Sequence, residues 1–393
     1  MDRSPHLGPE HCRPDYSGNG FLNLVASLVA ARGGEPRHAG LDALPAAEMA
    51  DVRNVVFLII DGLGDNYLRG AGGALADARR CAISAVFPST TACAITTSYT
   101  GLSPLEHGLT GWHTYFGEAA CVGAPLPFTI RGGERTLGAR GLTPQDLYRG
   151  GGCMDGMDAR TIVVSWDAIL ESRYNRHHCG GAERIAYSNL EGLVSGIEHA
   201  VESGPERKFI YAYWWEFDRI AHRFGVGSPH ALAHFRQVDA AFASLMQRLA
   251  GTGTAVVASA DHGFVDSAAD EMLSIEDAPG LAGLLRYPLS GERRIAWCYV
   301  QPGREAEFAA RAAAWLGERA DVRPSRELLD DGWLGPGDPH PRIGERIGDV
   351  AIVMRGRNTL KDWVAGEPRF LHIGNHGGTS ADEMLIPLIL ART

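Results

Sequence analysis

Arg53-Asn-Val-Val-Phe-Leu-Ile-Ile-Asp-Gly62 is a continuous apolar stretch that ends abruptly in a carboxylate and a glycine. The run from Val55 to Ile60 contains no polar residue and is rich in β-branched side chains, so it predicts a strand buried on both faces. Strands of this kind are typical of parallel sheets covered by helices. Asp61 is then expected at the carboxyl end of the strand, where open α/β sheets bind their ligands.

Similar apolar runs recur along the chain, and helical patterns separate several of them. These runs lie at residues 161–165, 208–214, 254–259 and 349–354. Strands that alternate with helices indicate an α/β fold with a mostly parallel central sheet and helices on both faces. Phe21 to Arg32 carries apolar residues at helical spacing, which predicts an amphipathic helix packed on this body.

The length of 393 residues is compatible with two to three domains or with one large domain that carries insertions. We expect a single α/β domain over residues 1–393. The region 267–341 has a helical pattern of its own at 305–316 and a strand pattern at 294–300, so we expect it to form a small inserted cap subdomain. The Gly- and Pro-rich region 114–156 is a second expected insertion.

The composition is that of an ordinary globular protein, with 45% hydrophobic and 21% charged residues, which argues against extensive disorder. A net charge of -10 without any run of Lys or Arg disfavours a large nucleic-acid partner, whereas a small phosphorylated substrate is compatible with bound divalent cations. No apolar run reaches membrane-spanning length, so we expect no membrane partner. Seven scattered cysteines without a CxxC pair, together with the lack of a signal-peptide pattern, predict reduced thiols and a cytoplasmic protein.

Acidic and imidazole side chains gather at the predicted strand ends. Asp261 and His262 follow the strand that ends near residue 260, and they could bind one ion if both lie in the turn beyond it. Asp218 and His222 are four residues apart, which on a helix places them on one face as paired metal ligands. His376 lies in a Gly-Asn-His-Gly-Gly segment. Each of these features alone has a simpler interpretation as a helix cap, a turn or a solvated pair, but together they favour a metal site.

Mixed carboxylate and imidazole ligands suit Zn²⁺ best, with Mn²⁺ or Fe²⁺ as alternatives, because Mg²⁺ and Ca²⁺ prefer oxygen. The candidate ligands are Asp61, Asp218, His222, Asp261, His262 and His376. Six ligands are too many for one tetrahedral zinc, and they fit two ions that each keep open positions. The sequence therefore predicts two divalent metal ions.

A candidate nucleophile lies in Phe87-Pro-Ser-Thr-Thr-Ala-Cys93, directly before a predicted helix that runs to Thr100. The N-terminus of a helix attracts anions and favours an ionised oxygen. The simpler interpretation is that Ser89, Thr90 and Thr91 only supply a helix N-cap. Spacing alone does not choose among the three hydroxyls.

Six short motifs occur in a fixed order along most of the chain, and they are weak singly but specific together. They are Leu58-Ile-Ile-Asp-Gly62, Phe87-Pro-Ser-Thr-Thr91, Thr100-Gly-Leu-Ser-Pro-Leu-Glu-His-Gly108, Glu216-Phe-Asp218 with His222, Ala260-Asp-His-Gly263 and Asn375-His-Gly377. In this order they resemble the nucleotide pyrophosphatase/phosphodiesterase branch of the alkaline phosphatase superfamily. The resemblance implies an alkaline-phosphatase-like α/β fold with a small inserted cap.

The resemblance also implies roles for single residues. The family's nucleophile stands ten positions before the Gly of its Thr-Gly-Leu segment, which here selects Thr91 over Thr90. One family metal would be held by Asp218, His222 and His376. The other would be held by Asp61, Asp261 and His262, with the Thr91 oxygen beside it. Family members commonly carry zinc in both sites.

We therefore expect a metal-dependent hydrolase of phosphate esters, of the phosphodiesterase or nucleotide pyrophosphatase type, that forms a phosphothreonine intermediate. The enzymatic alternative is a phosphomonoesterase or phosphonate hydrolase of the same superfamily. A non-catalytic metal- or phosphate-binding protein is the alternative from another class. The expected partner is a small phosphorylated substrate, with a nucleotide as one candidate.

Substrate contacts are expected from three further residues. The chain lacks the asparagine that family phosphodiesterases usually offer to a phosphoryl oxygen, so Asn66, His113 or a backbone N–H is expected to replace it. Trp112 is expected to line an apolar pocket for a nucleoside or alkyl group, together with other aromatic residues. No Arg or Lys stands near Thr91 in the sequence, which favours a diester over a monoester dianion. Arg294 is interpreted as a solvated surface residue.

Overall fold

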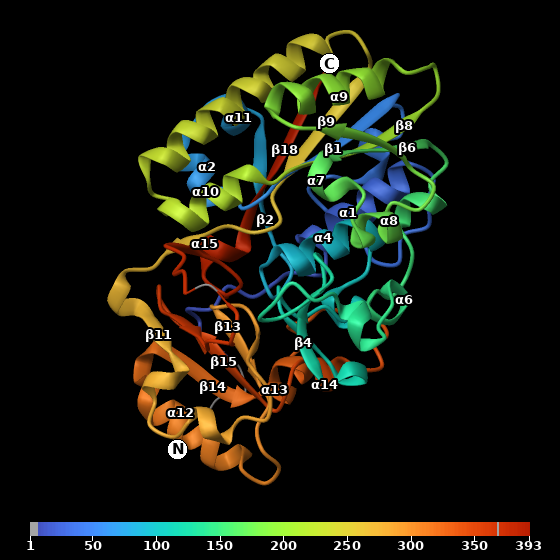
Figure 1. The fold of residues 1–393 in the computed structure, drawn as a ribbon. Coiled ribbons are helices and arrows are strands. Elements are labelled where there is room, and N and C mark those ends of the chain that lie inside the picture. The colour runs from blue at the N-terminus through green and yellow to red at the C-terminus, as the bar shows by residue number, and fades with distance from the viewer. Residues whose placement is uncertain (1–6, 368) are drawn as a thin grey trace.

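A seven-stranded sheet forms the centre of the larger part of the protein in the computed structural model, which describes residues 7–367 and 369–393 (Figure 1). Its strands, in spatial order, are β2 (Arg79–Ser84), β18 (Leu385–Arg392), β9 (Thr254–Ser259), β1 (Asn54–Ile60), β8 (Lys208–Trp214), β6 (Arg160–Trp166) and β7 (Glu183–Tyr187). The pairs from β9 to β7 are parallel, whereas β18 is antiparallel to both β9 and β2. The predicted mostly parallel sheet is therefore confirmed.

Helices cover both faces of this sheet, which explains why the central strand β1 is apolar from Val55 to Ile60. The helices named here are α1 (Phe21–Ala31), α4 (Thr91–Thr100), α9 (Leu190–Glu202) and α11 (Pro229–Arg248). Figure 1 shows α9 and α11 on one side of the strands and α1 and α4 on the other. Side chains alternate along β1, so neighbouring residues face different helices. Phe57 faces α1, and the centroid of its ring lies 6.1 Å from that of the Phe21 ring. Leu58 and Ile60 face a small apolar cavity lined by α9 and α11.

A second, smaller sheet lies beside the main body, at the lower left of Figure 1. Its four antiparallel strands, in spatial order, are β12 (Ser290–Gly291), β13 (Ile295–Cys298), β15 (Val350–Met354) and β14 (Ala320–Pro324). Helix α12 (Glu305–Leu316) has the predicted bounds, and its Phe308 and Leu316 share an apolar cluster with Ile352 of β15. We call the part of the chain built around this sheet the cap.

One apolar run joins a different sheet from the one predicted. Residues 349–354 match the pattern of the main parallel sheet, but Val350–Met354 form β15, one of the two inner strands of the antiparallel cap sheet. Ile352 packs in the cluster of α12, whereas Val353 packs on the opposite face in a cluster that includes Phe87. The strand is buried on both faces because α12 covers one side and the main body covers the other. Periodicity alone cannot separate these two causes of burial.

The cap extends beyond residue 341, the end expected from the sequence. Strand β15 follows that residue, and so does β16 (Thr359–Lys361), which pairs with β11 (Met272–Ser274) at the start of the region. The paired strands therefore connect residues 272 to 361. Region 114–156 contains a three-stranded sheet of its own, formed by β3 (Thr114–Phe116), β4 (Cys121–Ala124) and β5 (Thr129–Ile130).

Shorter elements complete the described chain. They are α2 (Asp65–Ala71), α3 (Ala74–Asp77), α5 (Pro104–His107), α6 (Pro144–Leu147), α7 (Asp167–Leu170), α8 (Arg173–His178), α10 (Glu216–Phe224), α13 (Ser325–Asp330), α14 (Ile343–Arg346), α15 (Ala381–Met384), β10 (Val265–Asp266) and β17 (Gly374–Asn375). Within residues 7–367 and 369–393, no helix combines the length and the apolar character that crossing a membrane requires. All seven cysteines are unpaired.

Candidate active site

The candidate ligands converge where three adjacent strands of the main sheet end. Strand β1 lies between β8 and β9, so the carboxyl ends of these three parallel strands share one edge. Asp61 follows β1, and Asp261 and His262 follow β9. Helix α10 begins directly after β8 and carries Asp218 and His222. The expected position beyond the strand ends is therefore found for all five residues.

One group of potential ligands consists of Asp61, Asp261 and His262. Their ligand atoms all lie within 4.8 Å of one another. Nε2 of His262 is 3.3 Å from Oδ1 of Asp61 and 3.6 Å from Oδ2 of Asp261. All three side chains are buried, and the Gly62 N–H donates to Oδ1 of Asp261 at 2.9 Å.

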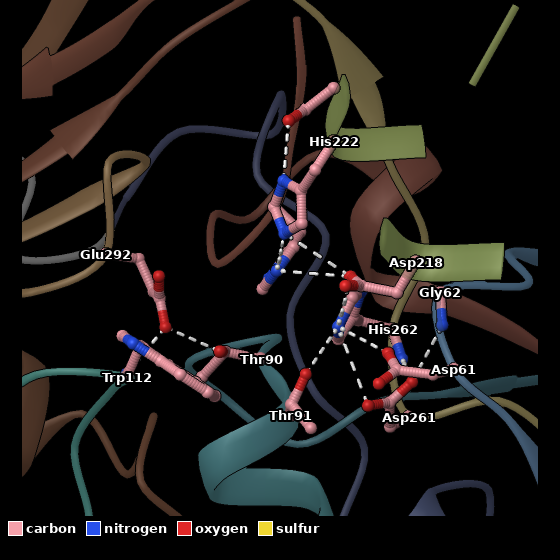
Figure 2. A network of polar contacts seen from close by, with 12 residues as sticks. Asp61, Gly62, Thr90, Thr91, Trp112, Asp218, His222, Asp261, His262 and Glu292 are labelled. Atoms are coloured by element: carbon pink, nitrogen blue, oxygen red, sulfur yellow. Dashed lines mark hydrogen bonds and ion pairs between the residues drawn. The ribbon is translucent and has the colours of Figure 1, made fainter. Parts of the chain in front are cut away.

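The second group consists of Asp218, His222 and His376, and it adjoins the first. The Nε2 atoms of His222 and His376 face each other at 3.2 Å, and Oδ1 of Asp218 lies 3.4 and 3.7 Å from them (Figure 2). Oδ1 of Asp218 is also 4.0 Å from Nε2 of His262, which belongs to the first group. The six side chains therefore form two adjoining clusters of three, the division that the family resemblance implies.

Backbone carbonyls orient all three imidazoles in the same way. Nδ1 of His222 lies 2.9 Å from the Gly374 carbonyl oxygen, and Nδ1 of His262 lies 3.1 Å from that of Gly263. Nδ1 of His376 lies 3.2 Å from the carbonyl oxygen of Ser89. A carbonyl oxygen can only accept, so each Nδ1 carries the proton and each Nε2 keeps its lone pair for a metal.

The electrostatics of the two clusters fit bound cations. Oδ1 of Asp61, Oδ1 of Asp218 and Oδ2 of Asp261 are buried without a hydrogen-bond partner among the described residues. Burial raises the pKa of Asp61 to about 6, and burial together with the neighbouring Asp61 charge raises the pKa of Asp261 to about 7. Burial lowers the pKa of His222 to about 3. Buried carboxylates without partners and neutral imidazoles are the groups that divalent cations stabilise, so the donor set fits a metal centre.

Thr91 lies at the first position of α4, against the first cluster. Its Oγ1 is 3.2 Å from Nε2 of His262. Thr90 is the N-cap residue of the helix, and its hydroxyl donates to Oε1 of Glu292 in the cap. The two threonines therefore point to different neighbours, and Thr91 is the one that adjoins the potential ligands.

A pocket of about 420 Å³ opens between these clusters and the cap. Trp112 and His113 line it together with Thr91, as the sequence predicts for a substrate pocket. Burial lowers the pKa of His113 to about 3, so this side chain is neutral at pH 7. Asn66 does not belong to the pocket, because it is exposed on α2 and donates to Asp382.

Several pocket residues were not identified from the sequence. They are Arg131, Glu292, Arg293, Lys361, Asp362, Glu367 and His372. Glu292, Arg293 and Lys361 come from the cap, and none of the seven lies within a recognisable motif. The adjacent charges of residues 292 and 293, directly before the predicted strand at 294–300, are the only local signal. Tyr213, whose hydroxyl donates to Asp61, was also not identified, because it lies in no recognisable motif.

The sequence-based expectation that Arg294 is a solvated surface residue is wrong. Arg294 is buried rather than solvated, and its guanidinium forms two hydrogen bonds with the carboxylate of Glu383, at 3.0 and 2.8 Å. Glu383 also accepts from the Gly378 N–H, two residues after His376. The ion pair therefore connects the cap sheet to the loop that carries His376, and Arg294 is not available to a substrate.

Comparisons with known proteins agree with this geometry. A family model for type I phosphodiesterase/nucleotide pyrophosphatase matches residues 154–378, more than half of the 393-residue chain. Murine ectonucleotide pyrophosphatase/phosphodiesterase 5 is similar in structure, with a TM-score of 0.64, 15% identity, and coverage of 85% of this chain and 87% of that chain. Phosphonoacetate hydrolase from Sinorhizobium meliloti 1021 is also similar in structure, with a TM-score of 0.59 and 18% identity. The match covers 86% of this chain and 90% of that chain. No curated protein sequence matches the chain.

The similar structures show that the chain shares an alkaline-phosphatase-like fold with them. The match to the family model shows the family to which the chain belongs. The matched range contains five of the six potential ligands, namely Asp218, His222, Asp261, His262 and His376. Asp61 and Thr91 lie before it, and the structure brings both to the same place. The chain belongs to the type I phosphodiesterase/nucleotide pyrophosphatase family of phosphoester hydrolases, within the alkaline phosphatase superfamily.

Proposed function

We propose that this protein is a metal-dependent phosphodiesterase that forms a phosphothreonine at Thr91. The observation that carries the proposal is the position of the Thr91 hydroxyl. It lies 3.2 Å from Nε2 of His262 and lines the same 420 Å³ pocket as Asp218, His222 and His376. A nucleophile next to one potential metal cluster, in a pocket shared with a second, fits the two-metal arrangement that stabilises in-line displacement at phosphorus.

The proposed cofactors are two divalent ions, one for each cluster of three ligands. A carboxylate and imidazole donor set supports Zn²⁺, with Mn²⁺ or Fe²⁺ as alternatives. Such ions, when bound, supply Lewis acidity that stabilises the attacking and leaving oxygens. The hydrogen bonds from Nδ1 to backbone carbonyl oxygens fix the tautomers of His222, His262 and His376. They keep Nε2 of each ring directed at its cluster.

The chain's own residues then perform the transfer. The Thr91 oxygen releases its proton to solvent and forms a bond to phosphorus while the bond to the leaving alcohol breaks. The N-terminus of α4 favours the negative charge, because the first N–H groups of a helix have no partner within it. Water then attacks the phosphothreonine, the P–O bond to Thr91 breaks, and the hydroxyl is regenerated.

The proposed substrate is a small phosphate diester, with a nucleotide as one candidate. Trp112 and Phe370 line the pocket and are 39% and 48% exposed, so flat apolar surface is available beside the reacting phosphorus. Aromatic faces of this kind stack on nucleobases or other rings. An inactive variant of the murine neighbour was solved in complex with AMP, which supports testing nucleotides first.

The test is substitution of the proposed nucleophile. Thr91→Ala should abolish cleavage of bis(p-nitrophenyl) phosphate, while elemental analysis should find the same metal content as in the wild type. Thr91→Ser keeps a hydroxyl and should retain part of the activity. Turnover by Thr91→Ala at the wild-type rate would refute the phosphothreonine, and bound metal without turnover of any ester by the wild type would favour a binding protein.

A phosphonate hydrolase is the second candidate, and one observation favours it. The Arg293 guanidinium lines the pocket, donates to the Phe370 carbonyl oxygen at 3.0 Å, and has no carboxylate within 4.0 Å in the described chain. It could therefore bind the carboxylate of a carboxylated phosphonate. A neighbour of the same fold is named a phosphonoacetate hydrolase. Release of inorganic phosphate from phosphonoacetate, at a rate above that of diester cleavage, would favour this candidate.

A further inference from the structure

A turn of the cap carries Glu292 into the pocket beside the nucleophile. The turn connects β12 to β13, and the Glu292 N–H donates to the carbonyl oxygen of Ile295 across it at 2.7 Å. Residue 113 of the main body pairs with Gly291 through two backbone hydrogen bonds, of 3.2 and 2.7 Å. A Cβ at Gly111 would lie only 2.5 Å from Cα of Gly291, so the two backbones are in close contact. The backbone that carries Glu292 is therefore held in place.

The side chain of Glu292 is also fixed, through one of its two oxygens. Oε1 accepts from the Thr90 hydroxyl at 2.5 Å and from the Trp112 N–H at 2.6 Å. A Cβ at Gly377 would lie 2.5 Å from Cβ of Glu292, so the glycine next to His376 makes room for this side chain. Glu292 is thus packed between the start of α4 and the His376 loop, and its Oε2 makes no hydrogen bond to the described chain.

The charge of this carboxylate is not neutralised by an ion pair. No Lys, Arg or His nitrogen of residues 7–367 and 369–393 lies within 4.0 Å of it. The neighbouring pocket cations have other partners, because Arg131 and Lys361 contact Glu367 and Arg293 contacts a carbonyl oxygen. Burial raises the pKa of Glu292 to about 7. A purely structural role would not require an unpaired carboxylate at the edge of a reaction pocket.

The direction of Glu292 relative to the reacting phosphorus indicates what it discriminates. Figure 2 shows the Thr91 hydroxyl between two sides, with the potential metal ligands on one side and Thr90 and Glu292 on the other. A phosphorus atom attacked by Thr91 with oxygens at the ligand clusters would therefore direct its remaining substituent towards Glu292. In a monoester this substituent is a further anionic oxygen, whereas in a diester it is an ester group without charge.

We propose that Glu292 is the specificity-determining residue of this site, because its free carboxylate oxygen repels the additional anionic oxygen of a monoester and tolerates the neutral ester group of a diester. The inference rests on the proposed phosphodiesterase function and assigns that selectivity to one residue. Two like charges about 4 Å apart in a partly dry pocket correspond to discrimination of roughly 10- to 100-fold once solvent screening is included.

The experiment compares wild type with Glu292→Gln, both loaded with metal, at pH 8.5. The amide keeps the size of the side chain, and its oxygen can accept both hydrogen bonds. The ratio of kcat/KM for p-nitrophenyl phosphate to that for bis(p-nitrophenyl) phosphate should rise about 10- to 100-fold in the variant, with metal content and Tm preserved. An unchanged ratio in a folded, metal-loaded variant would overturn the proposal.

A matched control and a binding measurement separate this inference from the proposed function. Glu134→Gln removes the same charge from an exposed position that does not line the pocket, and its ratio should equal that of wild type. Calorimetric titration with inorganic phosphate should give about 10-fold tighter binding for Glu292→Gln and no change for Glu134→Gln. If the metal-loaded wild type cleaves no diester, the phosphodiesterase function alone is refuted. If Glu292→Gln and wild type bind phosphate with equal affinity, the role of Glu292 is refuted.

Discussion

The buried ion pair between Arg294 and Glu383 gives the sharpest test of how the cap is joined to the active-site loop. The exposed fractions of the two side chains are 1% and 0%, and two N–H···O contacts of 3.0 and 2.8 Å join them. Glu383 also accepts from the Gly378 N–H at 2.8 Å and from the Ser380 hydroxyl at 2.6 Å. Arg294→Met removes the guanidinium but keeps a long apolar side chain, so the carboxylate stays buried without its cation.

The magnitude follows from the cost of an unpaired buried charge. Removal of one partner of such a pair lowers the free energy of unfolding by about 3–5 kcal/mol. Glu383→Gln should cost a similar amount, because it leaves the buried Arg294 guanidinium without its anion. The double variant should be less destabilised than the sum of the two singles, with a coupling of about 2 kcal/mol, because no unpaired charge is left.

The pH dependence gives an independent check with a definite sign. Burial alone would raise the pKa of Glu383, but the charge and hydrogen bonds of Arg294 hold it below its ordinary value. In the wild type this stabilisation is present above the ordinary glutamate pKa and is lost as the pH falls towards the lowered value. In Arg294→Met the pKa of Glu383 rises, so protonation relieves the buried charge. The deficit of the variant relative to wild type should therefore shrink as the pH is lowered from 8 to 5.

The assay is urea unfolding of wild type, the two single variants and the double variant, followed by tryptophan fluorescence. Arg326→Met is the matched control, since its ion pair with Asp330 is 75% and 58% exposed and should change stability by less than about 1 kcal/mol. Additive losses from Arg294→Met and Glu383→Gln, within about 0.5 kcal/mol, would show that the pair is not coupled and would refute the reasoning.

Three further predictions concern the site, the cap and the pocket. Tyr213→Phe removes the hydroxyl that donates to Asp61, so metal affinity measured by chelator competition should fall about 10- to 100-fold, and unchanged affinity would exclude an orienting role. Phe308→Ala empties the centre of the cap core and should lower the free energy of unfolding by about 3–5 kcal/mol, whereas a loss below 1 kcal/mol would contradict the packing. Partial burial raises the pKa of Glu367, but the hydrogen bonds and charge of Arg131 lower that pKa to about 2. Stability from this pair is complete above pH 4.5 and lost towards pH 2, so the unfolding midpoint of wild type should fall more steeply over that range than that of Glu367→Gln.

The sequence alone predicted several strands of the main sheet, the candidate ligands and the candidate nucleophile. Continuous apolar runs predict strands buried on both faces, and β8 and β9 have the predicted bounds. Asp61, Asp261 and His262 could be found because they follow predicted strand ends, and Asp218 and His222 because they share a helix face. His376 was predicted from its flanking glycines, and all of these relations are local in sequence. The choice of Thr91 over Thr90 required the family spacing, and the structure brings Thr91, not Thr90, to the first cluster.

Tertiary structure decided the features that depend on contacts between distant segments. The run at 349–354 has the same pattern in either sheet, and only its pairing with β13 and β14 assigns it to the cap. Glu292 meets Thr90 across 202 positions of sequence, and Arg294 meets Glu383 across 89. Local sequence patterns indicate the period of a strand or helix and the residues of a turn. They do not indicate which distant segments pair with each other. The candidate ligand set can therefore be predicted from the sequence, whereas the pocket beside it forms only where the cap packs on the main body.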